Sequence, residues 1–270
     1  MNQSTLHHIC EKVSQSLPYP QKNILGVFPF GSIFYGSLYD EYKSDIDCCA
    51  IYVPTLEDIT VGRIVSAEIS LSIILDSDSP EYYTNICVLD VRKFFLGWST
   101  LRFMEILHAP NNYFWINPIY KEDWNYLKTY KETIVAQNCI NILREGKGTM
   151  LGKNTFKTET VNSSNHYRVH HSYRLYNLLK HYLKSGKLVF QDSNIPSEHR
   201  IVSAEELLKI KKNGLSIFSE DTIESYNETI LNLGNEIDKV VTLLTTLNLN
   251  KTNLIDMKNI VKNILKKGLQ

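Results

Sequence analysis

Apolar residues recur at two different spacings along the chain, and the change of spacing divides it into two parts. Helical spacing near the N-terminus predicts a helix over residues 4–17, which ends before the prolines at positions 18 and 20. Four short apolar or alternating runs then predict β-strands, which cover residues 24–30, 45–53, 67–75 and 85–89. Two helices are expected to follow, at residues 90–98 and 101–108.

After Pro118 the strand-like runs cease, and helical spacing predicts the remaining elements. The expected helices cover residues 121–144, 166–185, 204–212, 220–247 and 253–267. Residues 146–164 form a polar connection rich in Lys and Thr, which is typical of a mobile loop at an active site. We therefore predict an α+β (mixed α/β) fold. It consists of a small mixed β-sheet core at residues 1–118 and a mostly helical C-terminal domain at residues 119–270.

The composition narrows the class of protein. Of the 270 residues 43% are hydrophobic and 21% are charged, which is ordinary for a soluble globular protein. Basic and acidic residues both number 29, which argues against a strongly basic surface for long nucleic acid and leaves a local patch open. The five cysteines include no Cys-x-x-Cys, which favours free thiols in a reducing compartment. Because we see neither a signal-peptide layout nor an apolar run near the roughly 18 residues of a membrane span, we expect a cytoplasmic protein without a membrane partner. The sequence leaves the oligomeric state open.

Residues suited to chemistry lie around the ends of the first two predicted strands. The first strand ends at Gly31-Ser32 and is expected to open a short helix, whose backbone N–H groups suit a phosphate together with the Ser32 hydroxyl. A glycine at position 31 lets a ligand approach the backbone closely. The sequence therefore predicts a phosphate-binding turn at this point.

Asp45 and Asp47 stand two residues apart on the second predicted strand, so they project from one face with roughly 6.6 Å of rise between them. Two acids on one face repel each other unless a cation neutralises them. Mg²⁺ takes one or two carboxylates together with substrate phosphates, and Mn²⁺ is the alternative ion. Two such ions about 3.5–4 Å apart would activate a hydroxyl and stabilise the leaving pyrophosphate.

Each of these motifs has an ordinary structural explanation when it stands alone. Asp-x-Asp occurs often in solvated turns, and Gly-Ser is a still weaker signal. Their order, with a strand before each and an apolar run directly after Asp47, favours a functional site.

Together these residues resemble the nucleotidyltransferase motif of the DNA polymerase β superfamily, in which Gly-Ser is followed at short distance by Asp-x-Asp. More narrowly, the chain is similar to the RNA-repair-associated, or YcgL-like, predicted nucleotidyltransferases of bacteria and phages. The segments that carry this resemblance lie within residues 24–245: Gly31-Ser32 with Tyr35-Gly36, Ser44-Asp45 with Asp47, Asp90 to Phe94, Met104 to Leu107, Arg168 with His171 and Arg174-Leu175, and Ile210 to Gly214. The resemblance implies an NTP substrate, a Mg²⁺ or Mn²⁺ cofactor and RNA as a partner. It also implies nucleotide binding by Gly31, Ser32 and Tyr35.

Arg168, His171 and Arg174 share one broad face of a predicted helix, where two guanidinium groups and an imidazole suit a triphosphate or an RNA phosphate. A solvated helix face is the alternative explanation, and the resemblance favours phosphate binding. His170 is expected on the surface. The tyrosines at 167, 173 and 176 are expected to serve packing rather than base stacking.

Two departures from the family pattern affect the expected chemistry. Ile33 stands where the family has an Arg after Gly-Ser. More seriously, the third carboxylate of the superfamily, counted back from Asp90, falls on Asn85, whose amide brings no charge. Glu68, on the polar side of the alternating strand, is the candidate substitute.

Three functions follow as hypotheses. The first is an enzyme that transfers a nucleoside monophosphate from an NTP to a hydroxyl, with RNA (for example a tRNA end) as the favoured acceptor. The second is a catalytically weakened protein of the same fold that binds nucleotide or RNA, which Asn85 favours. The third is an enzyme that nucleotidylylates a small molecule or a protein.

Overall fold

The computed structural model describes residues 3–35, 45–76, 81–97, 99–152, 163–247 and 255–269. Contacts between Cα atoms divide the chain into two compact units. The first contains the β-sheet, the flanking helices as far as Ile134 and the C-terminal helix, and the second contains the helices that follow Ile134. The α+β class and the helical character of the C-terminal part are confirmed.

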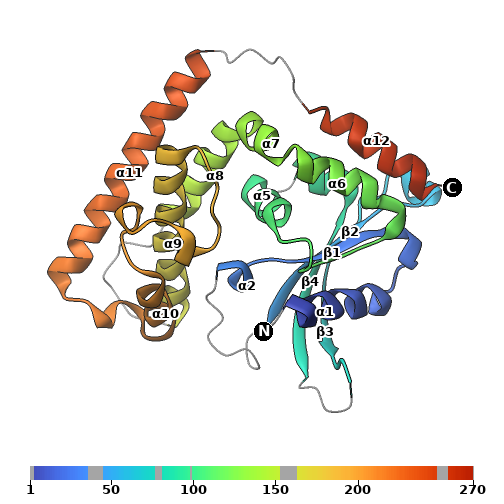
Figure 1. Cartoon of the computed structure of the whole chain (residues 1–270), viewed down its shortest axis with the longest axis horizontal. Helices are drawn as coiled ribbons and strands as arrows, with labels where there is room; N and C mark the ends of the chain where they lie inside the picture. Colours follow the sequence, from blue (N-terminus) through green and yellow to red (C-terminus); the bar gives the residue numbers. More distant parts are fainter. Residues whose placement is uncertain are drawn as a thin grey trace. The chain divides into compact units, whose positions relative to one another are not determined.

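Five strands of the described residues form one mixed sheet in the order β3-β4-β2-β1-β5 (Figure 1). Their bounds are β1 Ile24–Pro29, β2 Ile46–Tyr52, β3 Ser66–Ile73, β4 Tyr82–Asp90 and β5 Trp115–Ile116. β2 and β4 run parallel, and the other neighbouring strands are antiparallel. The four predicted strands are confirmed, although β4 begins three residues before the predicted start at Asn85. The two-residue strand β5 was not predicted.

Helix α1 (Gln3–Ser16) covers one face of this sheet. Its apolar residues pack with even-numbered positions of β2 and β4, such as Cys48, Ala50 and Val88. Odd-numbered positions therefore face the other way, since side chains alternate along a strand. There Phe28, which pairs with Cys49 across β1 and β2, packs against Trp124 with ring centroids 4.5 Å apart. Asp47 belongs to this second face, and Asp45 immediately precedes β2.

The remaining helices of the first unit are short. They are α2 Ser32–Tyr35, α3 Leu56–Thr60, α4 Val91–Gly97, α5 Thr100–His108, α6 Lys121–Thr129 and α12 Met257–Gly268, with the 3₁₀ helices η1 Gln21–Asn23 and η2 Pro118–Tyr120. Helix α6 contacts α5, and α12 contacts α4. Because both helices pack with elements of the sheet core, the predicted boundary at residue 118 falls inside this unit.

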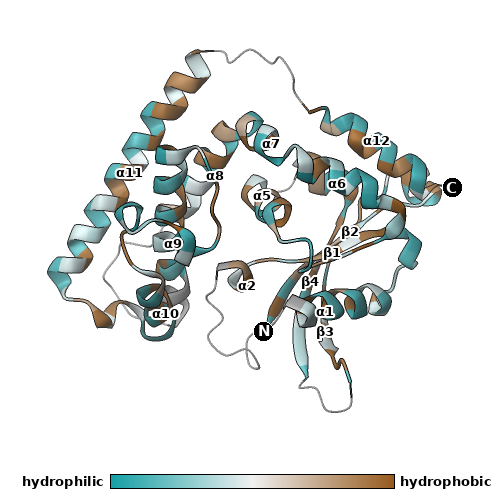
Figure 2. Cartoon of the chain, in the orientation of Figure 1, coloured by the Kyte–Doolittle hydropathy of each residue, from teal (hydrophilic) through white to brown (hydrophobic). Residues whose placement is uncertain are grey.

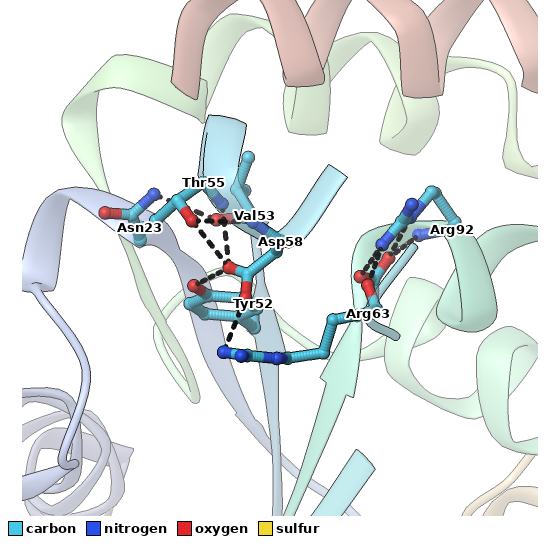
Figure 3. Close-up of polar contacts among 8 residues, drawn as sticks. Asn23, Tyr52, Val53, Thr55, Asp58, Arg63 and Arg92 are labelled. Carbon is cyan, nitrogen blue, oxygen red and sulfur yellow. Dashed lines mark hydrogen bonds and ion pairs between the residues drawn. The ribbon is translucent and has the colours of Figure 1, made fainter. Parts of the chain in front are cut away.

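A polar network closes the C-terminal end of β2 (Figure 3). The buried Asp58 accepts hydrogen bonds from the Tyr52 hydroxyl at 2.6 Å and the Thr55 hydroxyl at 2.8 Å, and it pairs with Arg63 at 3.1 Å. These bonds, the one from Tyr52 first, lower the pKa of Asp58 despite its burial. Asp47 lies near the opposite end of β2, so this network stabilises the sheet and is separate from the predicted site.

The second unit is a group of helices around α9. Its elements are α8 Cys139–Met150, α9 Ser163–Ser185, α10 Ala204–Asn213 and α11 Glu220–Thr246, with the 3₁₀ helices η3 Asp192–Asn194, η4 Ser197–His199 and η5 Gly214–Ile217. Helix α7 (Lys131–Gln137) crosses the division between the units. Helix α9 contacts α8, α10 and α11. A Cβ at Gly146 would lie 2.7 Å from Leu179, so the close approach of α8 and α9 requires glycine there.

Two helix predictions need correction. The single helix expected over residues 121–144 is divided into α6, α7 and α8, with breaks at Tyr130 and Asn138. The connection expected from residue 146 begins later, because α8 continues to Met150. Residues 153–162 of that connection lie outside the described residues.

Hydropathy differs between the strands and the outer helices (Figure 2). Strands β1, β2 and β4 are largely hydrophobic, whereas α11 and α12 alternate between hydrophobic and hydrophilic residues. In the described part of the chain, no helix combines the length and the apolar character that crossing a bilayer would require.

Candidate active site

The turn at Gly31 joins β1 to α2 and is fixed from two sides. The Phe30 N–H donates to the Asp47 carbonyl at 2.9 Å, and the Phe34 N–H donates to the Gly31 carbonyl at 3.0 Å. Gly31 has φ of 79°, a left-handed conformation that favours glycine. The strand, turn and short helix expected from the sequence are therefore present.

The backbone N–H of Gly31 is not presented in the way the sequence suggested. It donates to Glu105 Oε1 of α5 at 2.5 Å, and Glu105 is buried. A phosphate at this turn would thus use groups from Ser32 onward. The α2 helix is only four residues long, so its dipole contributes little.

Asp47 lies directly against this turn. A Cβ placed on Gly31 would come 3.1 Å from Asp47 Oδ2, which explains in space as well as in conformation why residue 31 is a glycine. Asp47 is half-buried on β2, and its main chain is held by Phe30. The structure therefore brings the Gly31 turn and one of the two predicted acids into contact.

Asn85 connects the second acid to the neighbouring strands. It is paired with Asp47 in the register of β2 and β4, and its Nδ2 donates to Asp45 Oδ2 at 3.1 Å. On the other side Ser70 Oγ of β3 donates to Asn85 Oδ1 at 2.9 Å. Asn85 thus lies beside both predicted acids, where the sequence placed the missing third carboxylate.

Glu68 is placed beside Cys87 rather than beside Asn85. It pairs with Cys87 in the register of β3 and β4, one strand further from β2 and two residues beyond Ser70. Burial raises the pKa of the Cys87 thiol, and the charge of Glu68 adds to the increase. The interaction of Glu68 is therefore with Cys87.

Asp45 and Asp47 offer the hard oxygen ligands that Mg²⁺ and Mn²⁺ prefer. Mg²⁺ usually takes one or two carboxylates and completes its shell with water and substrate phosphates, and the two aspartates fit that pattern. Within the described residues, no group of three or more His, Cys, Asp or Glu side chains is arranged to hold a metal ion. Gly36 and Ser44 of the predicted motif, and the side chain of Tyr35, lie outside the described residues.

The three basic residues of α9 differ in exposure. Arg168 is exposed, His171 is half-buried, and Arg174 is 3% exposed. The solvated helix face is therefore wrong for Arg174. In the same unit, burial raises the pKa of the Asp192 carboxyl, and the positive charge of Arg174 opposes that increase without cancelling it. The binding of phosphate by these three residues stays a prediction.

His170, expected on the surface, is instead 2% exposed. Burial lowers its pKa to about 3, with further contributions from Arg174 and Lys211, so the imidazole is neutral at pH 7. Tyr173 and Tyr176 are buried too, which confirms their role in packing, and Tyr173 meets Tyr226 edge to face with ring centroids 5.7 Å apart. The side chain of Tyr167 lies outside the described residues.

Comparison with known proteins does not place the chain in a family: no family model matches the sequence, and a search of curated proteins gives no match.

Exchanging Gly31 for Ala tests how closely Asp47 approaches the turn. Both Gly31→Ala and Gly62→Ala force a side chain into a left-handed conformation, at about 1–2 kcal/mol each. Gly62 has nothing within 4 Å of its Cβ position, whereas Gly31 meets Asp47. We expect Gly31→Ala to lower the free energy of unfolding further, by about 1 kcal/mol, and to weaken Mn²⁺ binding, as measured by urea denaturation and calorimetry. Equal losses in the two variants would contradict this geometry.

Proposed function

We propose that the protein is a metal-dependent nucleotidyltransferase, which transfers a nucleoside monophosphate from an NTP to a hydroxyl acceptor, with RNA favoured. The observation that supports this most is the contact of Asp47 with the Gly31 turn, together with the hydrogen bond that joins Asp45 to Asn85, the partner of Asp47 in the sheet register. Two carboxylates next to a turn whose conformation and close contacts favour glycine suit the binding of a metal and a triphosphate. The resemblance to the superfamily and the reducing compartment suggested by the free cysteines favour a cytoplasmic enzyme.

Each residue of the site has a part in this reaction. Asp45 and Asp47 would hold Mg²⁺ or Mn²⁺ against the triphosphate, and the bound ion would supply charge stabilisation for the departing pyrophosphate. Ser32, which follows the turn and begins α2, would contribute its hydroxyl or backbone N–H to phosphate oxygens. Asn85 orients Asp45 through its Nδ2 group. The net charge of zero favours a small or structured acceptor over long duplex nucleic acid.

The test is incubation of the purified protein with each α-labelled NTP, Mg²⁺ or Mn²⁺, and total RNA or protein. We expect label in RNA, and we expect Asp47→Asn to remove it, because one of the two metal-binding carboxylates is lost. Glu68→Gln is the matched control, since Glu68 is an exposed acid that pairs with Cys87 and not with Asn85 in the sheet register. Label in protein or in a small molecule would replace RNA as the acceptor. No transfer with any acceptor would contradict an enzyme.

A specific observation favours a second function, a protein that binds nucleotide or RNA and catalyses poorly. Asn85 falls where the resemblance implies a third carboxylate, and it is hydrogen-bonded on both sides, to Asp45 and to Ser70. An amide there is a poor acceptor for the proton of an attacking hydroxyl. Saturable NTP binding without any labelled product would identify this function.

A further inference from the structure

A buried carboxylate stands behind the Gly31 turn. Glu105 of α5 is 2% exposed, and its two oxygens have different partners. Oε1 accepts the Gly31 N–H at 2.5 Å, and Oε2 pairs with Arg102 Nη1 at 3.2 Å. A charge is buried only at considerable cost unless it is paired and hydrogen-bonded, so this arrangement ties α5 to a turn 74 residues earlier in the chain.

Arg102 is held beside the same turn by more than its ion pair. Its guanidinium carbon lies 4.8 Å from the centre of the Phe30 ring, and Phe30 immediately precedes Gly31. Its backbone N–H is bonded to the side chain of Ser99, the N-cap of α5, which fixes the start of the helix. The side chain of Arg102 is 29% exposed, whereas the side chain of Glu105, taken without its backbone, is 3% exposed. The guanidinium therefore lies at the boundary between the buried carboxylate and solvent.

The charges around the turn require such a cation if a triphosphate is to bind there. Asp47 lies on one side of Gly31, and Glu105 accepts its N–H from another. The carboxylates of Asp47 and Glu105 both repel an anionic ligand at this turn. A metal ion at Asp45 and Asp47 neutralises the charge of Asp47 and leaves that of Glu105. An Arg neutralises the charge of Glu105, and its planar group of N–H donors matches phosphate oxygens better than the point charge of a Lys.

We propose that Arg102 binds the triphosphate of the incoming nucleotide, and that Glu105 is a positioning residue that holds Arg102 and the Gly31 turn in register. The proposal rests on the proposed function, and it assigns a phosphate-binding cation to the same unit as the two aspartates. The alternative is an ion pair that only stabilises the attachment of α5.

Two substitutions separate these roles. Arg102→Gln removes the positive charge at a partly exposed position. Glu105→Gln keeps an oxygen for the Gly31 N–H and places an NH₂ group against the guanidinium, so it preserves the turn and displaces Arg102. Arg63→Gln is the matched control, because it breaks an Arg–carboxylate pair at the other end of β2 with the same change in net charge.

The measurements are NTP affinity in the presence of Mn²⁺, Mn²⁺ affinity without nucleotide, and thermal unfolding, all on the full chain. We expect Arg102→Gln to weaken NTP binding about tenfold or more, the loss typical of a charge-assisted hydrogen bond, with Mn²⁺ affinity unchanged. We expect Glu105→Gln to weaken NTP binding as well, but to add nothing in a protein that already carries Arg102→Gln, because it acts through Arg102. Arg102→Lys should recover part of the affinity, and Arg63→Gln should bind NTP as the unsubstituted protein does.

The outcomes distinguish this proposal from the proposed function. Unchanged NTP affinity in Arg102→Gln, or a loss in Glu105→Gln that persists in the double variant, would overturn the roles of the two residues and leave the proposed function standing. NTP binding that depends on Arg102 without transfer of label would support Arg102 and contradict the enzyme. An unsubstituted protein that binds no NTP would overturn both.

Discussion

Asn85→Asp is expected to increase nucleotidyl transfer by about 10²- to 10⁴-fold, the range over which general-base help acts. Asn85 lies beside Asp47 in the sheet and donates to Asp45 at 3.1 Å, so the new carboxylate would stand where a third acid can take the proton of an attacking hydroxyl. It would also add a negative charge that binds a second metal ion. The measurement is the rate of label transfer from NTP, for the variant and the unsubstituted protein side by side.

The same substitution has an expected cost that serves as an internal check. A carboxylate at position 85 can no longer donate to Asp45 and instead repels it. We therefore expect the metal-free variant to unfold at a lower temperature than the unsubstituted protein, and Mn²⁺ to restore more stability to it, because binding to the folded state alone is stabilising. In the unsubstituted protein Mn²⁺ is expected to support more turnover than Mg²⁺, since it accepts more varied ligands.

Glu68→Ala is the companion variant. Because Glu68 is paired with Cys87 and not with the two aspartates, we expect its removal to leave turnover unchanged. Loss of activity in Glu68→Ala would restore Glu68 as the third ligand. If neither variant alters turnover, Asn85 does not occupy the third position, whatever its distance from Asp45.

The sheet and the centre of the site could be anticipated because both depend on local patterns. β1 and β2 are continuous apolar runs with Gly31 and Asp47 at their adjoining ends, and strands of this kind are buried wherever they occur. Counting back from Asp90 placed Asn85 beside Asp47, and this worked because β2 and β4 are parallel and in register over seven pairs. By contrast, β5 has two residues and no period to detect.

The features that were missed depend on contacts between distant residues. Glu105 entered the sequence analysis only as part of the segment from Met104 to Leu107 that carries the resemblance, and nothing local shows that it accepts the N–H of Gly31. His170 was assigned to the surface because helical spacing separates faces without telling which neighbour covers each. In the structure α8, α10 and α11 all contact α9, so few of its positions reach solvent. The polar connection was predicted to begin at residue 146, yet Gly146 lies within α8, where its lack of a Cβ allows the close packing against Leu179.

Asp192→Asn is expected to stabilise the protein at neutral pH. Asp192 begins η3 with 2% of its surface exposed, and burial raises the pKa of its carboxyl to about 7 from an ordinary value of 3.8, against the opposing charges of Arg174 and Arg200. The folded state then binds a proton that the unfolded state has released between about pH 4 and 7. The contribution of the Asp192 carboxyl to the free energy of unfolding therefore has its full value below pH 4 and is lost as the pH rises to 7.

An Asn at position 192 resembles the protonated carboxyl and does not titrate, so the variant avoids that loss. At about 1.4 kcal/mol for each unit between the two pKa values, its advantage at pH 7.5 is on the order of 4 kcal/mol and vanishes near pH 4. Urea unfolding of both proteins from pH 4 to 8 measures the difference. Asp238→Asn is the control, because Asp238 is 59% exposed and its pair with Lys147 is solvated. The prediction is contradicted if the difference in the free energy of unfolding between Asp192→Asn and the unsubstituted protein does not change from pH 4 to 8. Asp192 would then be kept ionised by Arg174 and Arg200, and its negative charge would stabilise the buried Arg174.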